Sequence, residues 1–339
     1  MVLEQLFSDT WLERKFSTSF ILALSFTFVG VILARLLFGA NSGIVAVFFV
    51  ALLLIPGMRK LIRKEDRKEI SENGFSLKHL WKDNKDLFLT YLGIFVGVYV
   101  ATYAITYFSY LLGMDATTIF REQLFLEPAI SGRATFFSGL FWDILANNWW
   151  VLLATFLLGL ISGDGATFFV IWNASAWAAI FAFRSFAAGS LLSTSLVEVA
   201  IVLQLIVLPH LLIEGIAYIM AGIAGSIISQ DVVQESNEMH LFLIYFFFGI
   251  ILFTIGNMFL TRVIELQGLL FLARVVFTLI IVWAFHHAFT IKKHQSVFLY
   301  NYWLFVLAIV VFLIGVGVET FVLTGSETLE SFYIAARQF

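Results

Sequence analysis

The chain contains no cysteine, only three prolines and few charged side chains. Without cysteine its 339 residues can form no disulfide, no thiolate nucleophile and no zinc–thiolate site. So few prolines are typical of a chain that is mostly helical. Charged residues make up 13% of the sequence, well below the share in soluble domains. These shortages exclude a disulfide-rich secreted domain and argue against a water-soluble surface.

Apolar residues, in contrast, account for 61% of the chain. A chain this apolar cannot cover its outside with polar groups, so lipid rather than water is its main solvent. This excludes an ordinary soluble enzyme, a disordered tail protein and a nucleic-acid binder with a basic face. The net charge of −3 is too small to indicate a charged partner. We therefore predict an all-α fold, a polytopic transmembrane helix bundle. Its expected partner is the lipid bilayer, and no nucleic acid is expected to bind.

Apolar windows of the length that crosses a bilayer, about 20 residues, recur along the sequence. Before the first of them, Leu3, Leu6, Phe7 and Trp11 fall at helical spacing, which predicts a helix on the membrane surface. A cleavable signal peptide is not expected, because acidic residues lead this segment and no small-residue cleavage site follows it. The clear spans are expected at residues 17–38, 43–55, 87–112, 241–260, 268–288 and 297–323.

The long polar stretch at residues 58–86 carries nine lysines and arginines. The positive-inside rule places it, and with it the N-terminus, in the cytoplasm of a multi-pass cell-membrane protein. Its second half predicts an interfacial helix, because Phe75, Leu80 and Trp81 fall on one side. Short amphipathic helices outside the membrane are expected within 113–146.

The chain is predicted to divide into four regions: a surface helix and hairpin at 1–57, the basic loop at 58–86, a core at 87–260, and C-terminal helices with a tail at 261–339.

Two apolar stretches are too long for one crossing of a hydrocarbon core of about 30 Å. Residues 147–183 would measure about 55 Å as a straight helix, and Ser162-Gly163-Asp164-Gly165 interrupts them. Residues 196–228 would measure about 50 Å, and Pro209 interrupts them. Each stretch is predicted to be a pair of short helices or a strongly kinked one. Such interruptions are tolerated at membrane depth only where protein or a wet cavity shelters them.

The basic clusters limit how often this middle region crosses the membrane. Lys292, Lys293 and His294 indicate a second cytoplasmic segment. The chain is outside after residue 112 and must be inside before residue 241, so an odd number of crossings lies between. Three crossings, or one crossing plus a re-entrant hairpin, both satisfy the charges. The total is about eight to nine membrane helices, including broken or re-entrant ones.

Two sequence patches carry a family resemblance. One begins with Asn147-Asn148 and continues through the glycine-rich break to Asn173, and the other is Pro209-His210 followed by Glu214 and by glycines. In order and approximate spacing, these patches resemble the stage II sporulation protein M (SpoIIM-like) family of integral membrane proteins over roughly residues 87–260. The chain departs from the family pattern where Leu211 replaces a glycine.

The resemblance implies a polytopic membrane protein without catalytic activity of its own. Such a protein would act as a scaffold or assembly partner in envelope or membrane remodelling, with protein partners or as a homo-oligomer. The motif residues are then the candidate intramembrane polar site: Asn147, Asn148, Gly163, Asp164, Gly165, Asn173, Pro209, His210 and Glu214.

An ionisable side chain at bilayer depth costs at least ~2.5 kcal/mol, so it is expected to face inward and to be paired. His210 and Glu214 are four residues apart and share one helical face. They could stabilise the Pro209 break, bind a proton or solute, or form half of a metal site. A metal site would lack its further ligands in the nearby sequence, although His286 and His287 are distant candidates.

The other polar residues have simpler expected roles. The asparagines are expected to cap broken helix ends, and Asp164 to cap the following helix or to meet a cation. Glu319 lies deep in the last span, where it is expected to pair with an unidentified group. Arg184 and Arg274 lie near helix ends, where snorkelling to the interface is expected.

Three functions are consistent with these features. The first is the non-enzymatic scaffold that the resemblance implies, with no metal and no cofactor. The second is a transporter or channel with its site at the interrupted helices, near His210 and Glu214. The third is an intramembrane hydrolase, although the sequence contains no His-Glu-x-x-His, Gly-x-Ser-x-Gly or P-loop pattern. A transporter predicts a cavity at His210 and Glu214, whereas a scaffold predicts a filled core around Pro209.

Overall fold

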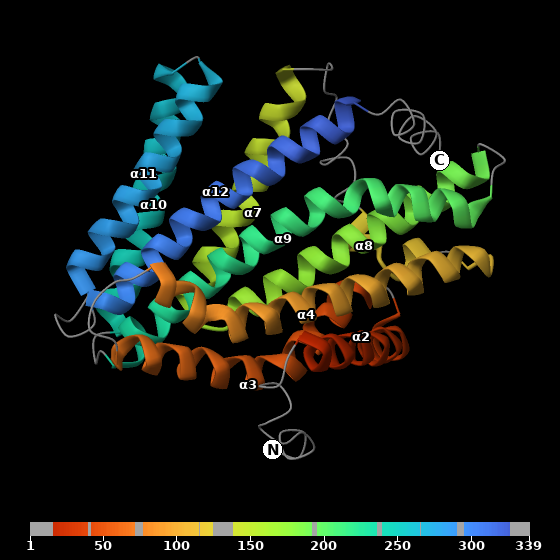
Figure 1. Ribbon diagram of the computed structural model, residues 1–339, viewed down its shortest axis with the longest axis horizontal. Coiled ribbons are helices and arrows are strands. Elements are labelled where there is room, and N and C mark those ends of the chain that lie inside the picture. Colours follow the sequence, from red (N-terminus) through yellow and green to blue (C-terminus); the bar gives the residue numbers. More distant parts are fainter. Residues whose placement is uncertain are drawn as a thin grey trace.

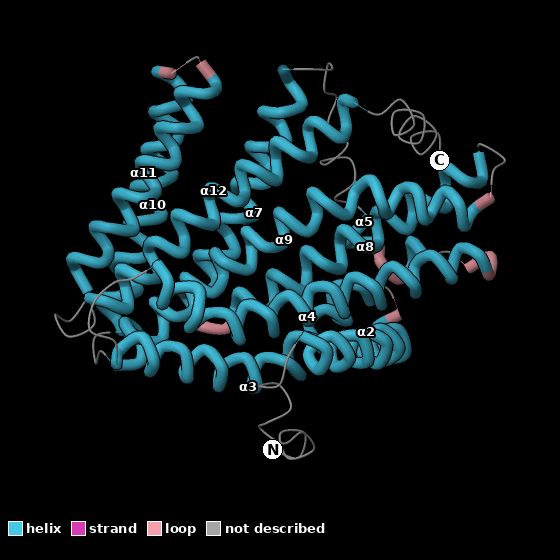
Figure 2. Tube along the Cα trace, viewed as in Figure 1, coloured by secondary structure: helices cyan, strands magenta, loops and turns pink. Residues whose placement is uncertain are grey.

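The computed structural model describes most of the chain, and its described part is helical throughout (Figure 2). This confirms the predicted all-α class. The predicted surface helix, the cluster at 292–294 and the C-terminal tail lie outside the described residues, and so do the side chains of His286 and His287. The described residues are 16–39, 42–71, 77–114, 116–124, 138–191, 195–235, 239–264, 266–289 and 295–325.

Within these residues, eight helices are long and apolar enough to cross a membrane, and α10 adds a shorter apolar stretch. This agrees with the predicted eight to nine membrane helices. The elements in order are α2 (Phe16–Phe38), α3 (Ser42–Ser71), α4 (Leu77–Leu111), η2 (Ala116–Thr118), α5 (Arg121–Leu124), α7 (Ser138–Ser162), α8 (Gly165–Leu191), α9 (Leu196–Glu235), α10 (Met239–Val263), α11 (Gln267–Phe289) and α12 (Gln295–Gly325).

The interruption predicted at residues 162–165 is present. Helix α7 ends at Ser162 and α8 begins at Gly165, so this stretch is two helices joined by a two-residue turn. Gly163 has a φ of +71°, a conformation that glycine adopts without the steric cost of a side chain. Both helices contain an apolar window long enough to span a bilayer.

Of the two forms predicted at Pro209, the pair of short helices is wrong, and the single kinked helix stays a prediction. Helix α9 is continuous over 40 residues and is about 60 Å long. Pro209 removes one backbone hydrogen bond, that to the carbonyl of Leu205, and both residues lie on the exposed face of the helix. The turns on either side keep their bonds, and α12, α7 and α8 pack along α9. One lost bond is therefore too little to end a helix that its neighbours support.

Three long helices, α7, α8 and α9, thus stand between α4 and α10. Three crossings are one of the two arrangements that the basic clusters allow, and the other, one crossing with a re-entrant hairpin, stays a prediction beside it.

Two segments differ from the expected loops. The first half of the basic loop at 58–86 is helical, because α3 continues from the predicted span through Pro56 to Ser71, whereas the helix expected in its second half corresponds to the start of α4 at Leu77. The connection after α4 contains the expected short helices, η2 and α5, but they insert into the bundle. Gln123 of α5 is fully buried and donates its side-chain amide to the hydroxyl of Ser175 on α8 at 3.1 Å.

The helices differ strongly in how far the bundle surrounds them. In α8, 72% of the apolar window is buried, whereas the figure for α11 is 11%. Figure 1 shows α10 and α11 as a pair to one side of the molecule, while α8 and α9 run through its middle. The centre of the bundle is therefore the group α7, α8, α9 and α12, in which α9 packs against each of the other three.

Polar side chains form hydrogen bonds between these helices. Such bonds determine which helix faces are in contact, which apolar packing alone does not. Tyr99, Tyr103 and Tyr107 form a stacked row along α4. Tyr99 donates to Gln204 of α9 at 2.7 Å, and Tyr103 bonds Ser185 of α8 at 3.0 Å. Interhelical hydrogen bonds of this kind add modest stability each and fix which faces meet.

Candidate functional site

A cavity of about 250 Å³ lies at the centre of the bundle, between α7, α8, α9 and α12. Five of the predicted site residues line it: Asn147, Asn148, Asn173, His210 and Glu214. Its remaining walls are mostly aromatic and aliphatic, and Glu319 of the last helix completes its polar lining. The other lining residues are Val151, Phe169, Trp172, Ala176, Trp177, Ile180, Phe181, Leu211 and Tyr218.

Two carboxyl groups meet in this cavity. The side-chain nitrogen of Asn148 donates to Oε1 of Glu214 at 2.9 Å and lies 3.4 Å from Oε2 of Glu319. Because both accept from the same nitrogen atom, the two carboxyl groups lie close together. Glu214 is 2% exposed, so water screens this contact little. Two like charges this close repel strongly, and the pair is stable only with a proton or a cation between its oxygens.

Positive charge reaches the pair from α8. Arg184 is buried and interacts electrostatically with Glu319. A single arginine can neutralise at most one of two carboxylates, so a neutral cavity needs at least one proton or external cation as well. This charge count gives the site room for one exchangeable positive charge.

Helix α12 approaches Glu214 closely because Gly315 lies where the two helices cross. A Cβ atom at Gly315 would stand 2.7 Å from Cγ of Glu214, which is closer than carbon atoms can approach. Gly315 is four residues before Glu319, so both lie on the face of α12 that meets α9. The glycine thus makes the room in which the two carboxyl groups meet.

His210 lines the same cavity but makes no bond with Glu214. It is 4% exposed, and within the described residues its Nδ1 atom has no hydrogen-bond partner. Although His210 and Glu214 share a helical face, Glu214 pairs with Asn148 instead, and His210 offers a free ring nitrogen to the cavity. No group of three side chains suited to hold a metal ion occurs in the described part of the chain.

The asparagines do not cap helix ends. Asn173 lies inside α8 and donates its amide to the carbonyl of Phe169 at 2.8 Å, while Asn147 lies inside α7 and donates to Oδ1 of Asn148 at 3.1 Å. The expected capping role is therefore wrong, since neither residue stands at an end. Within a continuous helix, each of these side-chain amides donates either to a neighbouring side chain or to a backbone carbonyl of its own helix. Both asparagines also line the cavity.

The Gly163-Asp164-Gly165 turn lies at the far end of α7, away from the cavity. Here Ser162 caps α8, because its hydroxyl accepts the backbone N–H of Gly165 at 2.8 Å. Asp164 instead accepts a hydrogen bond from Nε of Arg59 at 2.8 Å. Asp164 was predicted either to cap α8 or to meet a cation. Ser162 caps the helix, and Asp164 meets the guanidinium of Arg59 on α3. The motif residues therefore form two separate places, a polar cavity and an ion-paired turn.

Sequence reasoning missed several parts of this arrangement. It singled out Glu319 without finding its partner, and it overlooked Gly315, Tyr218 and Arg59. Gly315 could have been found from its spacing to Glu319. The two residues are four apart and share one helical face, as His210 and Glu214 do. Nothing in the sequence pairs that face with Asn148.

The fold and the apolar helices define an integral membrane protein with a polar cavity inside its helical bundle. No protein-family model, curated protein or solved structure matches this chain. The similarity to the stage II sporulation protein M family therefore remains a prediction carried by its motif residues.

Proposed function

We propose that this protein is a membrane transporter that exchanges a small cation for a proton at the Glu214–Glu319 pair. The observation that carries the proposal is the meeting of the buried Glu214 carboxyl group and the half-buried Glu319 carboxyl group on one amide donor, in a cavity able to hold a small molecule. A carboxyl pair of this kind holds either a proton or a cation, so binding one displaces the other.

The lining of the cavity supports a small organic cation as the exchanged solute. Trp172, Trp177 and Tyr218 line it together with the carboxyl groups. Aromatic faces attract cations through their quadrupole, and the attraction grows when water is excluded. A carboxyl group then supplies the counter-charge while the rings surround the apolar part of the solute.

The scaffold role that the family resemblance implies is a second proposal. It predicts a filled core around Pro209, whereas His210 and Leu211, the next residues of α9, line the cavity. This arrangement favours the transporter. A scaffold would reveal itself through protein partners that co-purify in stoichiometric amounts and are lost when its surface is altered.

Flux across liposomes tests the transporter. The full-length protein is reconstituted with a pH-sensitive dye inside the vesicles, and gradients of sodium, potassium, methylammonium and tetramethylammonium are imposed in turn. We expect at least one cation to drive proton movement, and we expect Glu214→Gln and Glu319→Gln each to abolish it. Glu198→Gln is the matched control, because Glu198 lies on the same helix but is exposed. Equal flux in the wild type and in both site variants would reject the proposal.

A further inference from the structure

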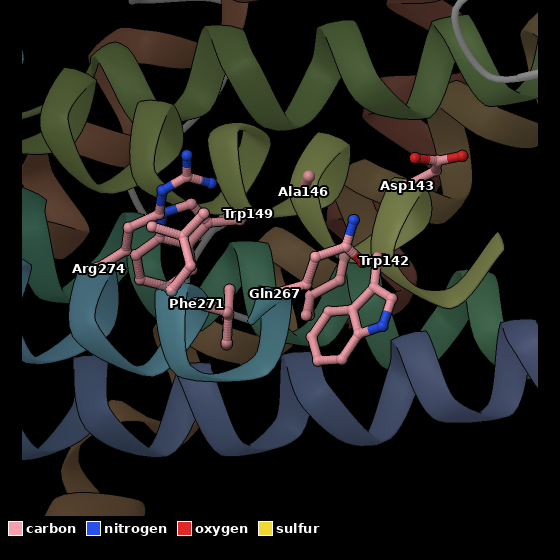
Figure 3. Close-up of a pocket in the computed structure, with 9 residues that line it drawn as sticks. Trp142, Asp143, Ala146, Trp149, Gln267, Phe271 and Arg274 are labelled. Carbon is pink, nitrogen blue, oxygen red and sulfur yellow. The ribbon is translucent and has the colours of Figure 1, made fainter. Parts of the chain in front are cut away.

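We propose that a second pocket, between α7 and α11, binds the phosphate group of a membrane phospholipid through Arg274. The pocket has a volume of about 150 Å³ and is separate from the carboxyl cavity. Figure 3 shows Arg274 and Phe271 of α11 facing Trp149 and Ala146 of α7, with Gln267 and Trp142 farther along.

Arg274 has a charge that no described side chain neutralises. The pocket contains one acidic residue, Asp143, but in Figure 3 its carboxylate stands at the opposite end from the guanidinium. Within the described residues no ion pair joins the two, and Nε of Arg274 is buried without a hydrogen-bond partner. A guanidinium presents a rigid set of donors that matches a phosphate in two parallel bonds.

The position of Arg274 limits which anions can reach it. It lies seven residues into α11, about 10 Å along the helix. Around it the helix is bare to lipid, since Leu272 is 58% exposed and Val276 47% exposed. At this depth on a lipid-facing helix, the anions at hand are the phosphates of the bilayer itself, whose acyl chains lie on the same apolar surface.

The rest of the pocket suits an interfacial headgroup. Trp142 packs over Gly268, where a Cβ atom would stand 3.1 Å from its ring, so the indole forms one wall beside the start of α11. Tryptophan is favoured at the boundary between headgroups and hydrocarbon. Gln267 adds a side-chain amide at the same end. The volume fits a phosphate and its ester oxygens rather than a whole lipid, so the chains must extend outside.

Thermal unfolding of the purified full-length protein in detergent tests this site. Binding raises the Tm with ligand concentration, so the protein is titrated with dihexanoyl phosphatidylglycerol, dihexanoylglycerol and inorganic phosphate. We expect a saturable rise with the phospholipid alone. Arg274→Gln should weaken its apparent affinity by about tenfold or more, the value of a charge-assisted pair of bonds.

Two further variants keep the test decisive. Ala146→Leu fills the pocket and leaves Arg274 in place, so it should also lose the response, even if Arg274→Gln fails to fold. Arg262→Gln removes an exposed arginine from the last turn of α10 and should respond as the wild type does. An unchanged phospholipid affinity in Arg274→Gln or in Ala146→Leu would overturn the proposal. A rise of the same size with inorganic phosphate alone would overturn the lipid as the source of the phosphate.

Discussion

Glu214 of α9 and Glu319 of α12 share one hydrogen-bond donor, the side-chain amide of Asn148 on α7. Three helices that are far apart in the sequence therefore meet at a single nitrogen atom. The shared amide stabilises two acidic groups inside an apolar bundle, where each would otherwise be costly. Because one of them belongs to α12, the position of α12 depends on the charge of the cavity.

Removing the shared donor should weaken the fold as well as the site. We expect Asn148→Ala to lower the free energy of unfolding by about 1–3 kcal/mol, the cost of leaving buried acceptors unpaired. Unfolding titrations with dodecyl sulfate in mixed micelles measure this change. Asn147→Ala is the comparison, because Asn147 is exposed and loses only its one bond to Oδ1 of Asn148, so it should cost less, about 0.5 kcal/mol. Equal losses in the two variants would mean that the carboxyl groups do not depend on Asn148.

Gly315 should be intolerant of even one added methyl group. Gly315→Ala places a carbon atom against Cγ of Glu214, so the glutamate must move and the carboxyl pair must separate. We expect cation-driven proton flux to fall by at least about tenfold, the effect of 1.4 kcal/mol lost at the site. Gly317→Ala is a matched control, because no atom lies within 4 Å of its Cβ position. Full flux in Gly315→Ala would contradict the close crossing of α9 and α12.

Pro209 should be dispensable, although it lies beside the site in the sequence. Because α9 is continuous and Pro209 is exposed, Pro209→Ala restores a backbone bond without disturbing a packed face. We expect stability to stay level or to rise, by at most the ~3 kcal/mol that proline costs inside a helix. Flux should persist. A loss of stability or of flux would indicate that a kink at Pro209 is needed.

The ion pair between Arg59 and Asp164 predicts which ends of the helices share a side of the membrane. It joins the basic end of α3 to the turn between α7 and α8, so those two places should be cytoplasmic together. Since the chain has no cysteine, single-cysteine variants report cleanly on sidedness. An impermeant maleimide should label Arg63→Cys and Ile161→Cys from one side. It should label Met114→Cys, at the end of α4, from the other. Labelling of Ile161→Cys together with Met114→Cys would overturn the order of crossings.

The fold class was predictable from the sequence because lipid imposes one strong rule on the backbone. Every spanning segment must satisfy its own hydrogen bonds, so apolar length alone indicates the helices. The break at Gly163 was equally predictable, since glycine is needed for its backbone conformation. The proline was misleading because a single lost bond is a local cost, and the packing that outweighs it comes from α7, α8 and α12, which are distant in the sequence.

The site was predictable only in part, for a related reason. His210, Glu214 and the asparagines stood out because polar groups in apolar helices are costly and need partners. Which partner each one finds depends on how helices cross. Glycines such as Gly315 decide the crossing, and a small residue gives no sign in the sequence of what it makes room for. The pairing of Asn148 with both glutamates is therefore a property of the assembled bundle.

Charge-selective labelling of the cavity tests the central claim most directly. Ala176→Cys places a thiol in the cavity wall of a chain that has no other, and methanethiosulfonate reagents of opposite charge then compete for it. We expect the cationic reagent to react at least about tenfold faster than the anionic one, because the carboxyl pair accepts a positive charge in exchange for its proton and repels a negative one across a short, poorly screened distance. Glu214→Gln should remove that preference. A thiol that reacts with neither reagent, or with both at the same rate, would contradict a cation-binding cavity at the centre of this protein.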